Sequence, residues 1–210
     1  IGTGDGIDQV YGIQFDNKGF PYVMGQTTGT WVNVNAAYFD TDGKQFIAKL
    51  QPDLSAYVYS TAFGAPGSTR PNISPTAFLV DRCENVYVSG WGGFFGNSNN
   101  YGSDGTLGLP TTPDAFQSTT DGKDFYFFVL RKNATARLFG SFFGERNTQG
   151  GGCDHVDGGT SRFDANGVIY QAICGNCRSL DRVNYPTTDG SQNGSSTGCN
   201  LGMLKVAFNL

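Results

Sequence analysis

Cysteines and a single histidine are the residues of this 210-residue chain whose side chains could carry covalent or metal chemistry. Four of the five cysteines lie close together toward the C-terminal end: Cys153, Cys174, Cys177 and Cys199. In an oxidising compartment such a density predicts two disulfides, and four cysteines allow more than one connectivity, between which the sequence does not choose. Cys83 stands apart in a short turn and is expected to be a free thiol.

Zinc binding is the alternative use of the same residues. Cys174 and Cys177 form a C-x-x-C pair, to which Cys153, His155 and Cys199 could add ligands. A second C-x-x-C or a clean H-x-x-x-H pair is absent, so we expect disulfides and no bound metal. A redox role is disfavoured further, because a redox-active C-x-x-C normally opens a helix in a thioredoxin-like fold.

His155 lies in the segment DHVD, between Asp154 and Asp157, and such a segment could supply an acid–base pair. No serine or cysteine motif of the nucleophile-elbow type accompanies it. A single histidine also has no second imidazole with which to hold a catalytic metal. We therefore expect no catalytic residues, and a loop histidine that hydrogen-bonds between structural units.

Asp-Gly pairs recur along the chain, and one of them resembles a calcium loop. In FDTDGK the alternating Asp40 and Asp42 are weak candidates for calcium ligands. Ordinary turns explain the other pairs, because Asp-Gly is a preferred turn dipeptide. We expect no cofactor, with calcium kept as the alternative.

The segment WGGFFGNSNNYG, residues 91–102, combines aromatic rings with amide side chains. Rings can stack on sugars while amides hydrogen-bond hydroxyl groups, a mixture that suits carbohydrate or peptide recognition. The candidate binding residues are Trp91, Phe94, Phe95, Asn99 and Tyr101. Packing inside the fold is the other explanation, and we favour it for Trp91.

Composition predicts an all-β protein. The chain has 31 glycines, 17 phenylalanines, 10 tyrosines and only 15% charged residues, and no long segment has helical periodicity with caps. A net charge of −4 without a Lys/Arg cluster argues against nucleic-acid binding, and no apolar run is long enough for a membrane-spanning helix. Cysteine usage favours secretion, and the start at Ile1 is expected of a mature product or a piece of a longer protein.

The elements that must position these residues are repeated β-hairpins. FIAKLQPDLSAYVYSTAFG, residues 46–64, aligns without a gap on YFFVLRKNATARLFGSFFG, residues 126–144. An earlier hairpin, with Asp16 and Gly25, recurs at an offset of 65 with Asp81 and Gly90. A third unit begins with SRFDANGVIYQAIC and ends with LGMLKVAFNL, residues 201–210, without a fourth strand.

Units of four antiparallel strands repeated head to tail are typical of β-propeller blades. We therefore predict a β-propeller-like array with repeat units at residues 1–64, 65–144 and 145–210, the third of them incomplete. Strands that alternate in direction would place the long insertions, residues 28–44, 92–123 and 175–199, on one face of the array. Loops on one side of a rigid scaffold are where binding usually resides.

The repeats resemble the seven-bladed β-propeller-type (SBBP) repeat of bacterial surface proteins. The resemblance is carried by FDNKGFPYVMGQT, by FIAKLQPDLSAYVYSTAFG, and by the middle segments LPTTPDAFQ and YPTTDGSQ, the counterpart of which is missing from the first unit. VDRCENVYVSGWGG and CDHVDGGTSRFDANGVIYQAICGNC look like the version in very large surface proteins of gliding bacteria. The resemblance implies export through type IX secretion and a role in adhesion, surface filaments or gliding motility.

The leading functional prediction is a non-catalytic structural or adhesive module of a large secreted surface protein. Its expected partners are neighbouring blades or domains of the same protein, other copies in a surface assembly, and a glycan. Two alternatives stay open: a carbohydrate- or calcium-binding lectin, and a propeller hydrolase or lyase that acts on glycans. The inner strands contribute mainly apolar residues, with Asp16, Asp81 and Asp164 at the turns, which disfavours the enzyme.

Overall fold

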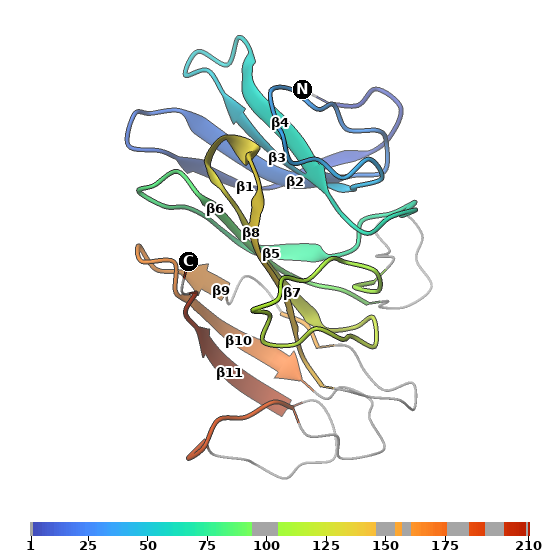
Figure 1. Ribbon diagram of the computed structural model, residues 1–210, viewed down its shortest axis with the longest axis vertical. Helices are drawn as coiled ribbons and strands as arrows, with labels where there is room; N and C mark the ends of the chain where they lie inside the picture. Colours follow the sequence, from blue (N-terminus) through green and yellow to red (C-terminus); the bar gives the residue numbers. More distant parts are fainter. Residues whose placement is uncertain are drawn as a thin grey trace.

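The computed structural model of the chain describes residues 2–93, 105–145, 154–156, 161–175, 185–191, 200–208 and 210. Within these residues, eleven strands form three antiparallel sheets, and the only helix is a three-residue 3-10 turn (Figure 1). The all-β prediction is confirmed. No helix in the described part of the chain is long and apolar enough to cross a membrane.

Sheet 1 and sheet 2 each contain four strands in sequence order. Sheet 1 consists of β1 (Asp8–Phe15), β2 (Pro21–Thr27), β3 (Gln45–Leu50) and β4 (Tyr57–Phe63). Sheet 2 consists of β5 (Ser74–Val80), β6 (Val86–Trp91), β7 (Phe125–Leu130) and β8 (Arg137–Phe143), with the turn η1 (Lys132–Ala134) before β8. Sheet 3 has three described strands: β9 (Ser161–Phe163), β10 (Ile169–Gly175) and β11 (Asn200–Val206).

The sequence repeat corresponds to a repeat in backbone irregularities. In β1 the pairing with β2 shifts between Val10 and Gly12, and in β5 the pairing with β6 shifts between Pro75 and Ala77. The later hairpins share a shift as well, beside Leu50 in β3 and beside Leu130 in β7. A bulge bends its strand and increases the local twist, so the first two sheets have the same curvature built in at the same places.

The three sheets are stacked face to face along the long axis of the molecule (Figure 1). Their first strands contact one another in turn, β1 against β5 and β5 against β9. Sheets 1 and 2 enclose an aromatic core in which the rings of Phe63 and Phe128 stack 4.2 Å apart. A second core between sheets 2 and 3 contains Phe127 and Ile173. Burying large aromatic side chains supplies most of the cohesion between sheets, at about 1.5–3 kcal/mol for each fully buried ring.

The insertions that precede β3 and β7 lie along the outer edge strands and do not simply project. Val34 exchanges two backbone hydrogen bonds with Ser60 of β4, and the N–H of Thr112 donates to the carbonyl of Gly140 in β8. Each of these residues has a buried apolar residue three positions before it, Trp31 before Val34 and Leu109 before Thr112. An edge strand has unpaired backbone groups on one side, and the insertions satisfy some of them.

This arrangement adds two points to the expectations from the sequence. The described parts of the first two insertions are hydrogen-bonded to the edge strands. Those residues are part of the sheets and are not free loops. The middle segment LPTTPDAFQ also has a structural counterpart in the first unit. Residues 31–34, WVNV, occupy the place of residues 109–112, LPTT, although the two segments share no residue type at any position.

Candidate functional site

The first hairpin turn of each sheet has the same backbone design. Asp16, Asp81 and Asp164 each accept a backbone hydrogen bond from the residue three positions later. That third residue has a left-handed backbone in all three turns: Gly19 with φ 80°, Glu84 with φ 66° and Gly167 with φ 80°. Left-handed geometry costs a residue with a Cβ roughly 1–2 kcal/mol more than glycine. Of these three turns, the one at Glu84 is therefore the only one in which a residue with a Cβ bears this strain.

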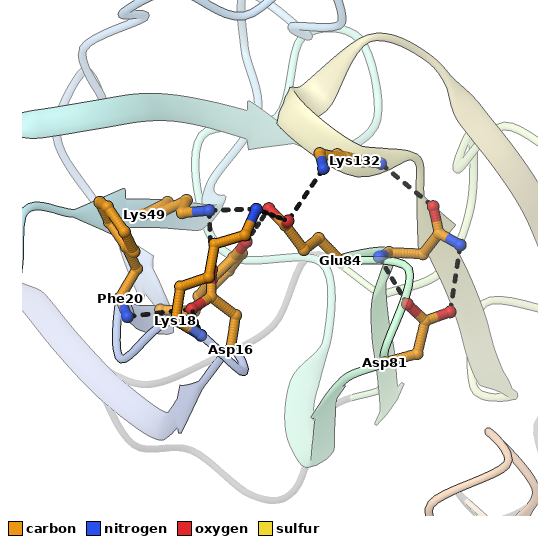
Figure 2. A network of polar contacts seen from close by, with 9 residues as sticks. Asp16, Lys18, Phe20, Lys49, Asp81, Glu84 and Lys132 are labelled. Carbon is orange, nitrogen blue, oxygen red and sulfur yellow. Dashed lines mark hydrogen bonds and ion pairs between the residues drawn. The ribbon is translucent and has the colours of Figure 1, made fainter.

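Glu84 is held at this strained position by three lysines, as Figure 2 shows. Its Oε1 lies 2.9 Å from Lys18 Nζ and 2.9 Å from Lys132 Nζ. Its Oε2 lies 2.8 Å from the Nζ of Lys49, and the hydroxyl of Tyr22 donates to the same oxygen at 3.4 Å. Lys18 and Lys49 belong to sheet 1, whereas Glu84 and Lys132 belong to sheet 2, so the carboxylate joins two sheets.

Lys49 is the buried cation of this network, with a side chain only 6% exposed. Its ammonium lies 2.8 Å from Asp16 Oδ2 as well as from Glu84. It also lies 4.7 Å from the ring centre of Phe20 and 5.0 Å from that of Tyr22. Two carboxylates and two ring faces thus replace the water that a buried ammonium loses.

The network is ionised at neutral pH. Hydrogen bonds from Lys132 and Lys49 hold the pKa of Glu84 far below its usual range. Burial opposes ionisation of Asp16, but hydrogen bonds from Lys49 and from the backbone of Phe20 outweigh it and lower the pKa of that carboxyl too. Both lowered pKa values stabilise the folded state above the unfolded-state values near 4, and this stabilisation is lost in acid as pH falls through the folded-state values.

A second group of carboxyls lies around Gly144, at the end of β8. A Cβ at Gly144 would be 2.1 Å from Asp124 Oδ1 and 2.8 Å from Asp154 Oδ2, so only glycine fits between them. The backbone N–H of Glu145 donates to Asp154 Oδ2 at 3.1 Å. Asp124, Asp154 and Glu145 are all at most 2% exposed, and neither carboxyl oxygen of Glu145 has a hydrogen-bond partner among the described residues.

Burial changes the protonation of this group in the opposite direction from the Glu84 network. It raises the pKa of Asp124 to about 6 and, together with repulsion from Asp121 and Asp124, that of Glu145 to about 7. Asp124 and Glu145 therefore take up protons near neutrality. No group of three or more His, Cys, Asp or Glu side chains in the described residues is arranged to hold a metal ion.

Glu145→Gln is expected to stabilise the protein at pH 8 by about 1–2 kcal/mol, because the folded protein no longer has to bury a charged carboxylate. Because the folded-state pKa of Glu145 lies above its unfolded-state value, the contribution of this carboxyl to stability is greatest below about pH 4 and declines as pH rises toward 7. At pH 4 both side chains are neutral, so the substitution should have little effect there. Urea unfolding at the two pH values measures this, and an equal change at both would contradict it.

Trp91 lies at the end of β6, half-buried, with its indole ring 5.8 Å from the imidazole of His155. His155 in turn exchanges two backbone hydrogen bonds with Cys174 of β10. The two rings therefore lie where sheets 2 and 3 meet. The other candidate glycan-binding residues lie outside the described residues: Phe94, Phe95, Asn99 and Tyr101.

The carboxylates of the weak calcium candidates accept hydrogen bonds within the protein. Asp40 Oδ2 accepts from the hydroxyl of Tyr38 at 2.7 Å and from the N–H of Gly64 at 3.2 Å. Asp42 Oδ2 accepts from the N–H of Gly67 at 2.8 Å. The bonds from Gly64 and Gly67 tie the turn before β3 to the residues that follow β4.

Three of the four cysteines of the predicted disulfides, Cys153, Cys177 and Cys199, lie outside the described residues. Cys174 is half-buried on β10, and Cys83 is exposed in the turn between β5 and β6. No disulfide is found within the described part of the chain, so the two predicted disulfides stay a prediction.

Sequence reasoning missed Lys49 and Glu84, although each left a signal. Lys49 is the one charged residue of a strand that is buried along its whole length. Glu84 stands where the other two aligned turns, NKG and ANG, have glycine. Neither signal reveals the partner, because the two residues belong to different repeat units.

No protein-family model matches the chain, and no curated protein sequence matches it.

Proposed function

We propose that the chain is a non-catalytic structural module, three consecutive units of a β-propeller-like array within a large secreted surface protein. In this role the units transmit load through their stacked sheets and support the loops that contact a cell surface or a filament. The observation that carries the proposal is the stacking of three equivalent sheets through aromatic cores, with first strands side by side.

The faces at the two ends of the stack support an array of more than these three sheets. On the outward face of sheet 1, Val10, Ile13 and Phe15 are each more than half exposed. On the outward face of sheet 3, Leu201 is 79% exposed and Met203 is 83% exposed. Apolar sheet faces of this kind are uncommon in a finished soluble protein and are expected where another unit packs.

The proposed location rests on the resemblance of the repeats to SBBP segments of exported surface proteins and on the cysteine-rich, lysine-poor composition. The motifs involved include FDNKGFPYVMGQT and LPTTPDAFQ. From these we infer export by type IX secretion and a role in adhesion or gliding.

Antibodies raised against this chain are expected to label intact cells of the organism that makes it. Brief protease treatment of the intact cells should remove the label, while an antibody to a cytoplasmic protein should label only permeabilised cells. A strain whose full-length protein lacks these 210 residues should still export the remainder but attach less to surfaces. Labelling that requires permeabilisation would contradict the proposal.

A further inference from the structure

Sheet 3 carries on its outward face a copy of the lysine–tyrosine pair that binds Glu84 on sheet 1. Lys205 of β11 is paired in register with Tyr170 of β10, as Lys49 of β3 is paired with Tyr22 of β2. The ammonium of Lys205 lies 5.5 Å from the ring centre of Tyr170, and that of Lys49 lies 5.0 Å from the ring centre of Tyr22. The two pairs thus have the same register and the same contact.

The turn beside each pair is equivalent as well. Asp164 Oδ1 accepts backbone hydrogen bonds from the residues two and four positions later, at 2.8 and 3.0 Å. Asp16 Oδ1 does the same at 2.9 and 3.0 Å. The aspartate, tyrosine and lysine of sheet 3 therefore have the backbone placement of the corresponding residues of sheet 1.

The two pairs differ in whether another sheet packs over them. Tyr22 and Ile47 of sheet 1 are fully buried because sheet 2 packs on them. Their counterparts on sheet 3, Tyr170 and Met203, are 45% and 83% exposed. No carboxylate among the described residues lies within ion-pair distance of Lys205. Sheet 3 thus presents outward the lysine over a tyrosine ring that sheet 1 uses to hold sheet 2, without the counterpart of the Asp16–Lys49 ion pair.

The interface between sheets 2 and 3 lacks both the lysine and the glutamate. Sheet 2 has Val129 at the register position of Lys49, paired with Tyr87. The turn of sheet 3 has Gly167, which lies against Tyr87, at the position of Glu84. Where the lysine of the preceding sheet is absent, the following turn has no acidic residue at that position. At this register position the chain therefore has one interface with a lysine–glutamate pair and one interface without it, built on the same backbone.

We infer that the outward face of sheet 3 is a docking surface for a further β-sheet unit whose first hairpin turn carries an acidic residue at the position of Glu84. The carboxylate of that residue pairs with Lys205 over the ring of Tyr170, while apolar residues of the incoming sheet cover Leu201 and Met203. This inference rests on the proposed array function. It adds a charge rule to that function: a unit with a lysine at the position of Lys49 is followed by a unit with an acidic residue at the position of Glu84.

The charge rule also excludes a second copy of this chain as the partner. A second copy of this chain, stacked in the same direction, would present the turn of its sheet 1. That turn has Gly19 in place of the glutamate and Lys18 beside it, so it brings a like charge toward Lys205. Like charges brought together at an interface disfavour the wrong partner. The occupant is therefore an acidic-turn unit and not another copy of this chain.

A cyclised hairpin peptide with the sequence of residues 74–91 is a suitable probe, with Cys83→Ser to prevent oxidation. It presents the Glu84 turn and the apolar residues that pack on sheet 1. Titrated into the isotope-labelled 210-residue chain, it is expected to shift the amide resonances of Tyr170, Met203 and Lys205. The Glu84→Gln peptide, matched in shape but uncharged, should bind at least about tenfold more weakly, because it covers Lys205 without supplying a counter-charge.

A charge swap provides the decisive comparison. The chain variant Lys205→Glu should lose binding of the wild-type hairpin and regain it with the Glu84→Lys hairpin. Lys205→Met, which keeps the apolar stem, should bind both hairpins weakly and equally. Recovery of binding in the swapped pair would support the inference, because unfolding of either variant could not produce it.

Three results would overturn the inference: no binding of the wild-type hairpin at millimolar concentration, affinity indifferent to charge at both positions, or shifts confined to β1. Affinity indifferent to charge would remove the charge rule and leave the array function standing. Failure of the array function would instead appear as absence of this chain from the cell surface, which the antibody experiment measures separately.

Discussion

Replacing Lys49 with methionine is expected to lower the free energy of unfolding at neutral pH by about 3–5 kcal/mol, because one buried ammonium neutralises two carboxylates. Asp16 and Glu84 both lie 2.8 Å from Lys49 Nζ, and their side chains are only 1% and 10% exposed, so each would be left largely buried without this cation. Urea unfolding followed by tryptophan fluorescence measures the loss. A decrease below about 1 kcal/mol would mean that the network contributes little.

The chain offers its own control for this prediction. The double variant Lys49→Val with Glu84→Gly reproduces the residues at the equivalent positions of the second interface, Val129 and Gly167. It removes the buried charges together and relieves the left-handed strain at residue 84. We expect it to be more stable than Lys49→Val alone, with a coupling between the two sites of about 1–3 kcal/mol. Additive losses would contradict the pairing.

Trp31→Ala is expected to destabilise the protein by about 3–5 kcal/mol, because it removes the largest side chain of the core on the outward face of sheet 1. Trp31 is 4% exposed, its ring stacks on Phe46 at 3.6 Å, and its Nε1 donates to Ser60 Oγ at 2.8 Å. Thermal unfolding followed by circular dichroism measures the change.

The neighbouring residue provides a matched control for Trp31. Val32 belongs to the same segment but is 46% exposed, so Val32→Ala should cost less than about 1 kcal/mol. Similar small effects at both positions would show that the insertion is not an integral part of sheet 1. A large effect at Trp31 alone would show that this insertion is structural, which leaves less of it for ligand binding.

The strands and their repetition were predictable from local patterns. Runs such as FIAKL and YFFVL favour the extended backbone, and the Asp-x-x-Gly turns, as in DNKG and DANG, place glycine where φ must be positive. These are properties of neighbouring residues, and therefore an alignment of the chain with itself revealed them. The same patterns indicated that the units need neighbours, because each strand pair is apolar on both faces.

The path of the insertions was not predictable in this way. Trp31 and Leu109 occupy equivalent positions although WVNV and LPTT share no residue type at any position. Their equivalence depends on backbone hydrogen bonds to Ser60 and Gly140 at the edge of each sheet. Main-chain pairing leaves almost no trace in side-chain identity, so the first unit looked incomplete in the sequence.

The sequence by itself determined an all-β chain of three related units, because strand and turn preferences are set by residues close together. Only the tertiary structure decided which charges meet. Lys49 reaches Glu84 because sheets 1 and 2 stack, and Asp124 and Glu145 have raised pKa values because packing removes their water. Electrostatic energy depends on distance and burial in space, and neither can be read from the position of a lysine or a glutamate along a chain.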